Sequence, residues 1–444
     1  MSSEWPAKRL GDCCDKIGSG ATPKGGKDVY LDEGPVRLIR SQNIYNDGFT
    51  PSGLAYISEE QARKLDGAAV QANDVLLNIT GDSVARVCQA PKQFMPARVN
   101  QHVAIIRPNN RYLDAQYLRY FLASPAQQDL MLGLAAAGAT RNALTKGMIE
   151  SFQVPCPPLG VQQGIAVTLG CLDDRITLLR ETNSTLEAIA QALFKSWFVD
   201  FDPVRAKMEG RAPEGMDEAT AALFPDALEE TELGPMPRGW RVGCVDDLCS
   251  VITNGGTPSR SKAQFWTGGT IPWFKTGEFS DGFLLQPNEF ITKEALEGSS
   301  VKVLPKDAVL MAIYAAPTVG RLGVLTEPAT FNQACTGMVA KVDVGPWFLY
   351  WTLFFGREWF NSRANGAAQQ NISKAIVSAY RVVIPHDVIL LAFNDVASSI
   401  HNRVRENAEQ AQTLATLRDT LLPRLISGQL SISDTGLQIE EAIV

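Results

Sequence analysis

The stretch that decides the fold is Val161–Phe198, VQQGIAVTLGCLDDRITLLRETNSTLEAIAQALFKSWF. Its apolar positions alternate four and three residues apart, with one Asn and one Ala completing the series: Ile165, Leu169, Leu172, Ile176, Leu179, Asn183, Leu186, Ala190, Leu193 and Trp197. A heptad pattern sustained over this length is typical of a coiled coil. At 1.5 Å per residue, a helix of roughly 38 residues is about 57 Å long. The pattern therefore predicts a rod that can hold two objects a fixed distance apart.

The same series of heptad positions, called the seam below, occurs a second time in the chain. Adding 228 to each position gives Phe393, Ala397, Ile400, Val404, Asn407, Ala411, Leu414, Arg418, Leu421 and Leu425. If the two halves are related by a two-fold axis, the two rods pack antiparallel. An alignment in which paired numbers add up to 590 places Asn183 opposite Asn407. Because a paired buried amide fixes register whereas an unpaired one is costly, we predict that these residues set the register of the coiled coil. The alternative is that each Asn lies on the exposed side of its rod.

The sequence outside the rods is also repeated. Gly20-Ala-Thr-Pro23 returns as Gly255-Gly-Thr-Pro258 at an offset of 235, and Asn100-Gln101 returns as Asn332-Gln333. A period of more than 200 residues indicates domain duplication rather than a solenoid of short repeats. The order along the chain is therefore globular unit, rod, globular unit, rod.

These patterns predict the fold class and the domain limits. Short apolar runs bounded by Gly, Asn and Pro indicate strands, and they are interspersed with amphipathic helices. We expect an α+β protein with two tandem mixed α/β domains joined by two long helices, which pack as an antiparallel coiled coil with pseudo-two-fold symmetry. The expected segments are a first globular domain, a first rod, an extended acidic and Pro-rich linker, a second globular domain, a second rod and a tail, at residues 1–157, 158–201, 202–237, 238–385, 386–428 and 429–444.

Composition limits the function. The chain has 444 residues with 45% apolar content, no run of about 18 apolar residues and no charged, apolar leader at Met1–Trp5. Its eight Cys form no CxxC pair and it has three His, so we expect no metal site, reduced thiols and a cytoplasmic location. A net charge of −7 argues against a strongly basic, free-standing nucleic-acid binder. Any positive charge that contacts DNA must be local or come from a partner.

No motif indicates an active site. Gly20–Lys27 is close to a phosphate-binding loop, but its Lys is one place late and Asp28 stands where Ser or Thr should bind magnesium. The second copy lacks the pattern, and no hydrolase or amino-methyltransferase motif is present. We expect neither catalytic residues nor a cofactor.

Both copies carry polar loops between apolar strands. Arg, Asn and Gln can form bidentate hydrogen bonds with purine edges, and Lys or the backbone amides of Gly-rich loops can hold phosphates. Each side chain alone also fits an ordinary exposed loop, but side chains that differ between two copies of one frame suggest two DNA-reading sites with different targets. The candidate DNA-binding residues are Lys24, Lys27, Arg40, Gln42, Asn43, Arg86, Arg141, Asn142 and Lys146 in the first copy, and Arg260, Lys262, Lys275, Thr276, Arg321, Gln369, Gln370 and Lys374 in the second. Asn100-Gln101 and Asn332-Gln333 recur unchanged, which favours a structural hydrogen-bonding role.

The chain resembles the specificity subunit of type I restriction–modification systems. The resemblance is carried by the order of units and rods, the two Gly-x-Thr-Pro motifs, the Asn-Gln pairs, the rod end LFKSWFVDFDP at Leu193–Pro203 and the second rod end LLPRLISG at Leu421–Gly428. It covers essentially the whole chain.

The resemblance implies a DNA-recognition role without catalysis. Each globular domain would be a target-recognition domain that reads one half of a bipartite site in double-stranded DNA. The rods would set the spacing of the half-sites and dock methyltransferase subunits, two of them, and motor–nuclease restriction subunits would join the complex. These partners would supply the S-adenosylmethionine and ATP chemistry.

Two other interpretations remain open at this point. The chain could be a scaffold that assembles through its rods and binds no DNA, or the specificity part split from a fused restriction–methylation enzyme. Phe194, Phe198 and Phe201 lie outside the heptad positions. They are expected to pack on a recognition domain or a methyltransferase subunit, or to close the end of the helix bundle.

Overall fold

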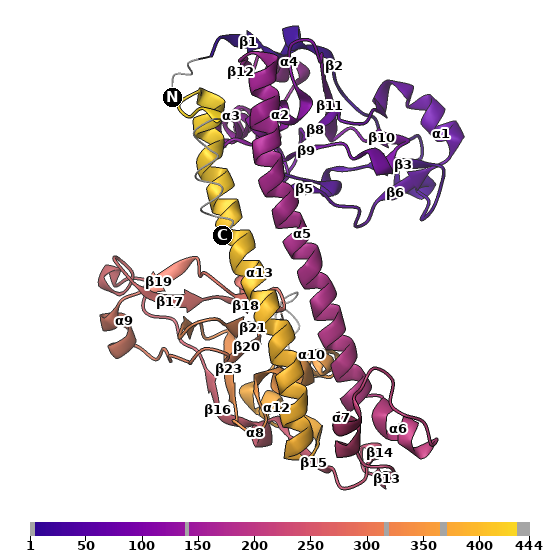
Figure 1. Cartoon of the computed structure of the whole chain (residues 1–444). Coiled ribbons are helices and arrows are strands. Elements are labelled where there is room, and N and C mark those ends of the chain that lie inside the picture. The colour runs from indigo at the N-terminus through magenta and orange to yellow at the C-terminus, as the bar shows by residue number, and fades with distance from the viewer. Residues whose placement is uncertain (1–4, 138–141, 315–318, 365–370, 433–444) are drawn as a thin grey trace. The chain divides into compact units, whose positions relative to one another are not determined.

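The computed structural model describes residues 5–137, 142–314, 319–364 and 371–432 (Figure 1). The chain divides into two compact units. Unit 1 comprises Met1–Leu178 and Gln410–Val444, and unit 2 comprises Leu179–Glu409. The predicted α+β class, with two repeated domains and a pair of long helices, is confirmed.

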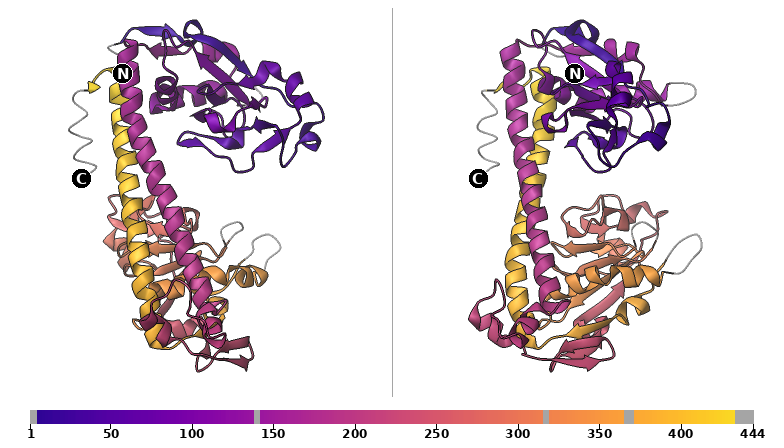
Figure 2. Two further views of the ribbon diagram at one scale, coloured as in Figure 1. Left: turned by 45° about the vertical axis from the view of Figure 1, so that its right-hand side comes forward. Right: turned by 90° about the vertical axis from the view of Figure 1, so that its right-hand side faces the viewer.

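The two heptad stretches form the two longest helices, α5 (Leu159–Phe198) and α13 (Asp387–Ser427). In unit 1 the start of α5 lies with the end of α13, and Ile165 and Leu425 of the seam are buried. In unit 2 the end of α5 lies with the start of α13, where the ring centroids of Trp197 and Phe393 are 6.0 Å apart. Figures 1 and 2 show the helices side by side and antiparallel within each unit. The apolar heptad positions explain this pairing, because they put one continuous stripe on each helix.

The first domain contains two four-stranded sheets. Their strand orders are β2-β11-β8-β9, with antiparallel neighbours, and β6-β3-β10-β7, in which β3 and β10 are parallel. The strands of unit 1 are β1 (Ala7–Arg9), β2 (Cys14–Ser19), β3 (Val36–Ile39), β4 (Ile44–Tyr45), β5 (Gly48–Phe49), β6 (Ala55–Ile57), β7 (Ala69–Val70), β8 (Val75–Asn78), β9 (Val87–Gln89), β10 (Ala97–Val99), β11 (Val103–Pro108) and β12 (Gln153–Pro155). Its shorter helices are α1 (Glu59–Lys64), α2 (Ala115–Ala123), α3 (Pro125–Ala136) and α4 (Lys146–Glu150).

The second domain repeats this strand order except at one edge of each sheet, where the larger sheet has an extra strand and the smaller sheet has one fewer. Its larger sheet has the order β16-β23-β20-β21-β18, and its smaller sheet the order β19-β17-β22, with β17 and β22 parallel. The strands are β15 (Arg241–Cys244), β16 (Cys249–Asn254), β17 (Ile271–Phe274), β18 (Gly282–Leu284), β19 (Glu289–Ile291), β20 (Val309–Ala312), β21 (Leu322–Leu325), β22 (Thr330–Phe331), β23 (Cys335–Ala340) and β24 (Arg381–Ile384). The helices are α8 (Val245–Leu248), α9 (Lys293–Glu297), α10 (Pro346–Phe355), α11 (Arg357–Ser362) and α12 (Lys374–Ser378). The duplication seen in the sequence is therefore a duplication of strand order.

The prediction of an extended linker at 202–237 is wrong. This segment forms α6 (Asp202–Met208), α7 (Glu218–Leu223) and a hairpin of β13 (Leu228–Thr231) and β14 (Gly234–Pro237). Phe224 is 3% exposed and lies edge-on to Trp197, with ring centroids 5.1 Å apart. Met236 is equally buried in the same hydrophobic cluster. These few apolar residues anchor the segment although its composition is that of a solvated linker. The remaining domain limits stay predictions.

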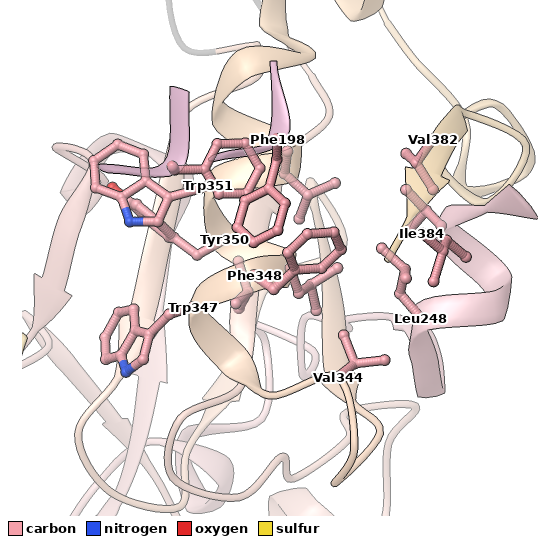
Figure 3. Close-up of a cluster of buried hydrophobic side chains, with 14 of the residues drawn as sticks. Phe198, Leu248, Val344, Trp347, Phe348, Tyr350, Trp351, Val382 and Ile384 are labelled. Atoms are coloured by element: carbon pink, nitrogen blue, oxygen red, sulfur yellow. The ribbon is translucent and has the colours of Figure 1, made fainter. Parts of the chain in front are cut away.

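The phenylalanines outside the heptad pattern pack on the second domain. Phe194 stacks on Phe355 at 5.4 Å between ring centroids, and Phe198 lies edge-on to Phe348 at 5.0 Å. Figure 3 shows Phe198 among the aromatic residues of α10. Phe201 is also buried there. Phe194 and Phe198 also lie edge-on to Phe393 of α13, with ring centroids 5.7 and 5.0 Å apart, so packing on the second domain and closure of the helix end are both found.

Two further observations bear on function. No helix among the described residues is long and apolar enough to cross a membrane. All eight cysteines lie within the described residues and are unpaired, and these residues contain no group of His, Cys, Asp and Glu suited to hold a metal ion.

Candidate nucleic-acid interface

A polar cavity opens on the first domain. Its volume is about 580 Å³, and its lining residues are Ser41, Gln42, Tyr45, Thr80, Gly81, Asp82, Ser83, Arg86, His102 and Asn142. Three of the candidate DNA-binding residues, Gln42, Arg86 and Asn142, are brought together here from separate parts of the chain. Nine of these ten residues, all but Gly81, have a side chain with a hydrogen-bonding group, so the cavity is suited to hydrogen bonding.

The cavity lies where several strands end. Gln42 belongs to the turn after β3, and Arg86 lies immediately before β9. Asn142 accepts a hydrogen bond from the amide of Gly81 at 3.3 Å through its carbonyl oxygen. Gly81 has a φ of +77°, so the turn after β8 uses a conformation that favours glycine. Sheet pairing thus fixes the loops from which the polar side chains project.

Tyr45 is a cavity residue that the sequence reasoning missed. The residue is 38% exposed, and the guanidinium of Arg86 lies over its ring at 4.7 Å from the centroid. A partly exposed ring with an adjacent cation offers a stacking surface as well as a positive charge. The signal was present in Ile44-Tyr45-Asn46-Asp47-Gly48, where an aromatic residue precedes a hairpin turn sequence.

His102 was also missed. Its Nδ1 is 2.5 Å from the hydroxyl of Thr80, and its Nε2 is 2.9 Å from the side-chain amide of Gln101. It directly follows the Asn100-Gln101 pair, so position next to a repeated motif was the available signal.

Asn43 is corrected from a DNA contact to a structural residue. Its side chain is fully buried. The amide oxygen accepts from the backbone of Arg40 at 3.0 Å, while the amide nitrogen donates to the carbonyls of Thr50 and Ser52 at 3.0 and 3.2 Å. An amide occupied in this way has no group to offer to a base, because every buried polar atom already has its partner.

The other basic candidates of the first domain that the structure describes do not line the cavity. Arg40 donates to the carbonyl of Gly53 and lies over the ring of Tyr30. Lys24 and Lys27 are exposed beside the Gly-rich loop, and Lys146 at the start of α4 pairs with Glu150 at 3.5 Å. Arg141 lies outside the described residues.

In the second domain two candidate cations share one carboxylate. Arg260 and Lys275 both pair with Glu289, and hydrogen bonds from these two groups hold the pKa of Glu289 below its usual value. The Arg260 guanidinium also lies 3.7 Å from the ring centroid of Trp266. These contacts gather positive charge and an aromatic surface, but Glu289 neutralises part of the charge.

The remaining candidates of the second domain do not form one cluster with these. Lys262 lies over the ring of Phe265 at 4.8 Å, and Lys374 is exposed at the start of α12, as Lys146 is at the start of α4. Thr276 and Arg321 are half-buried. Gln369 and Gln370 lie outside the described residues.

In both domains a hydrogen bond links the repeated Gly-x-Thr-Pro motif to the repeated Asn-Gln motif. Thr22 donates its hydroxyl to the side-chain oxygen of Gln101, and Thr257 does the same to Gln333. A Cβ on Gly20 would overlap the carbonyl oxygen of Val99, so this close approach requires glycine. The expected structural role of the Asn-Gln pairs fits these bonds.

The structure also brings Asn183 and Asn407 together. Asn407 donates its side-chain amide to the side-chain oxygen of Asn183 at 2.8 Å, and Asn183 donates to the carbonyl of Val404 at 2.8 Å. Both residues belong to unit 2. That the pair sets the register stays a prediction.

A family model and several known proteins that match this chain share one description. A family model described as the type I restriction modification DNA specificity domain matches residues 2–188 and 237–390. The type I restriction enzyme HindI specificity subunit of Haemophilus influenzae is 25% identical over 473 residues, which cover 96% of this chain and all of the relative. The MjaIX specificity subunit of Methanocaldococcus jannaschii is 22% identical over 442 residues, with 98% and 95% covered. The crystal structure of a type I system S subunit from M. genitalium covers 95% of this chain and 96% of its own, with a TM-score of 0.56 at 14% identity, which indicates a shared fold.

Proposed function

This chain belongs to the family of type I restriction–modification DNA specificity subunits, and we propose that each of its globular domains reads one half of a bipartite DNA site. In this proposal the polar cavity of the first domain, with Tyr45 and Arg86 at its wall, contributes to the reading surface for the first half-site. The second domain reads a different sequence in the same manner.

The observation that carries the proposal is the duplicated frame with unequal polar side chains. The two domains share the order of their central strands and the same Thr–Gln hydrogen bond, yet the loops around that frame carry different side chains. A purely structural duplication does not require different side chains at exposed polar positions. Reading two different half-sites does require them, because each base pair presents its own pattern of donors and acceptors in the major groove.

The proposal includes the partners. The chain assembles with methyltransferase subunits and restriction subunits, and two methyltransferases dock along α5 and α13, whose length sets the spacing of the half-sites. Catalysis belongs to these partners. The net charge of −7 is compatible with this arrangement, because the partners can supply much of the phosphate contact.

The direct experiment is base-resolved methylation sequencing of DNA from cells that carry this chain with its methyltransferase, compared with cells that lack the chain. A new methylated motif in two parts, separated by an unspecified spacer of fixed length, is expected. No new motif, with the methyltransferase expressed and bound, would contradict the proposal and favour a scaffold.

The contribution of the cavity is tested by Arg86→Ala in the purified complex. A bidentate arginine contact provides about 1–3 kcal/mol of discrimination, so binding to DNA with the correct first half-site should weaken by roughly 5- to 150-fold. The matched control is Arg63→Ala on α1, an exposed arginine paired with Glu59 of the same helix at 3.3 Å, which should leave binding unchanged. Equal effects of the two variants would argue against a role of the cavity in reading.

A further inference from the structure

A chain of hydrogen bonds leads from the cavity wall of the first domain to the interior of unit 1. Asn46 follows Tyr45, and its side-chain oxygen accepts from the amide of Val87 at 2.9 Å. Val87 directly follows Arg86, so this single bond ties together the two loops that carry the stacked pair of the cavity wall. The carbonyl of Asn46 in turn accepts from the guanidinium of Arg119 on α2 at 2.5 Å.

The chain of bonds ends on the long helices of the same unit. Arg119 and Tyr120 of α2 donate to one carboxylate oxygen of Asp173 on α5 at 2.7 and 2.6 Å, and Arg418 of α13 donates to the other at 2.7 Å. The side chain of Asp173 is only 18% exposed. Burial opposes its ionisation, but Arg119, Tyr120 and Arg418 hold the pKa of this carboxyl below its usual value. A buried carboxylate with three donors from two other helices fixes the position of α2 on α5 and α13.

Unit 2 contains equivalent bonds, but they pass through two neighbouring side chains of α10, Tyr350 and Trp351, where Arg119 alone joins both ends in unit 1. Asp281, at an offset of 235 from Asn46, accepts from the amide of Leu322 at 2.9 Å through its carboxylate, and Leu322 stands at the same offset from Val87. The carbonyl of Asp281 accepts from the hydroxyl of Tyr350 on α10 at 2.8 Å. Trp351, next to Tyr350, donates its indole N–H to Nε2 of His401 on α13 at 3.2 Å. His401 stands 228 residues after Asp173.

A side branch is repeated as well. In unit 1 the amide of Gln128 on α3 donates to the carbonyl of Ala85 at 2.9 Å, and its oxygen accepts from the side chain of Asn46 at 3.2 Å. In unit 2 Arg357 on α11 donates to the carbonyl of Gly320 at 2.9 Å and to the carboxylate of Asp281 at 3.1 Å. An amide pair in one unit is thus an ion pair in the other.

The two networks share the bond from the amide after Arg86 or Arg321, the bond to the carbonyl of Asn46 or Asp281, the bond from α2 or α10 to the long helix, and the side branch, although the residue types differ. Asn, Gln, Arg, Tyr and Asp in unit 1 stand where Asp, Arg, Tyr, Trp and His stand in unit 2, and the corresponding groups still pair. Chance contacts at the surface of a fold do not recur in this way, because each change of donor or acceptor at one position needs a matching change at the next. Both units therefore retain the attachment of the loop to the long helices, although the residues that form it differ.

We propose that two sets of residues are positioning networks, which hold the DNA-reading loops of each domain in place on the long helices of the same unit: Asn46, Arg119, Tyr120 and Asp173 in unit 1, and Asp281, Tyr350, Trp351 and His401 in unit 2. This inference rests on the proposed function and deepens it. The named residues touch no DNA; they act through Tyr45 and Arg86 in unit 1 and through the equivalent loops in unit 2. Each network is expected to govern the readout of its own half-site only.

The test exchanges the side branch of unit 1 for that of unit 2. In Asn46→Asp a carboxylate oxygen faces the side-chain oxygen of Gln128, and in Gln128→Arg a guanidinium faces the amide donor of Asn46. Both single variants leave like groups opposed. The double variant N46D/Q128R recreates the Asp–Arg pair that unit 2 uses.

The variants are compared with the wild type as the full chain in complex with its methyltransferase subunits, by equilibrium binding to DNA altered in either half-site, with thermal unfolding of each complex in parallel. Each single variant is expected to weaken discrimination at the first half-site about ten-fold and to leave the second unchanged. The double variant should return to within about three-fold of the wild type. The reciprocal single variant Arg357→Gln should affect the second half-site alone.

The outcomes separate the two proposals. A double variant that loses as much as both single variants together, single variants that weaken both half-sites equally, or single variants that unfold earlier without any change in discrimination would overturn the positioning role. Absence of sequence-specific binding by the wild-type complex would instead overturn the proposed function.

Discussion

Replacing the paired amides in the long helices of unit 2 gives the sharpest test of the heptad reasoning. Asn407 is 3% exposed and donates to Asn183, which is half-buried and donates to Val404. In Asn183→Leu the buried amide of Asn407 loses its acceptor. Because an unsatisfied buried polar group costs about 1–3 kcal/mol, we expect this variant to lose about 2–3 kcal/mol of stability. In Asn407→Leu the half-exposed Asn183 can bind water instead, so the expected loss is about 1 kcal/mol.

The double variant N183L/N407L removes both polar groups and places two leucines at facing seam positions. Its stability should lie within about 1 kcal/mol of the wild type, since no amide is left unpaired and apolar area is gained. In the double-mutant cycle formed by these three variants and the wild type, the coupling energy between Asn183 and Asn407 is therefore expected to be about 2–3 kcal/mol in favour of the pair.

The assay is urea unfolding of the full chain at 25 °C, followed by far-ultraviolet circular dichroism. Ser184→Leu serves as the control, because Ser184 neighbours Asn183 on α5 but is exposed, and it should change stability by less than about 0.5 kcal/mol. If the double variant loses the sum of the two single losses, the two amides do not act as a pair and the register argument fails.

Three further predictions follow from buried groups. Burial lowers the pKa of His401 from 6.5 to about 3, so between these pH values the unfolded chain binds more protons than the folded one. Unfolding curves should therefore show that the wild type loses about 2 kcal/mol of stability from pH 7.5 to pH 5, and that His401→Gln does not show this loss. An equal pH dependence in both proteins would contradict a buried neutral imidazole. Gly20→Ala should destabilise unit 1 by at least about 3 kcal/mol, because its Cβ meets a backbone carbonyl. Gly18→Ala, on β2 just before Gly20, has open space and should cost less than about 1 kcal/mol, as differential scanning calorimetry can show. Phe194→Ala, which removes a 4%-exposed ring from the cluster on α10, should cost about 3–5 kcal/mol in chemical denaturation, and a loss below about 1 kcal/mol would show that the ring is not part of that core.

The long helices and the duplication could be predicted because both are written in local or periodic patterns. Seam residues such as Ile165 and Leu425 follow a period that depends only on helix geometry. The segment at 202–237 could not be predicted in the same way. Its folding depends on Phe224 and Met236, two apolar residues that show no period and whose burial against Trp197 requires the end of α5 to be in place.

The candidate site was predicted in part. Gln42, Arg86 and Asn142 share the polar cavity, but Asn43, which precedes β4, is buried and structural. Neighbouring residues in a turn point in different directions, and the sequence does not say which of them faces the solvent. Tyr45 was overlooked because a single aromatic residue before a turn has many possible roles.

The sequence by itself determined the heptad seams, the domain duplication and the class of polar residues in the loops, because each of these depends on residue type and spacing along the chain. Only the tertiary structure decided which loops form the cavity. It alone also showed that hydrogen bonds link Asn46 through α2 to Asp173, and Asp281 through Tyr350 and Trp351 of α10 to His401. A hydrogen bond requires donor and acceptor within about 3 Å and well aligned. Partners this far apart in the sequence reach that geometry only through the pairing of strands and the packing of helices, which no local pattern specifies.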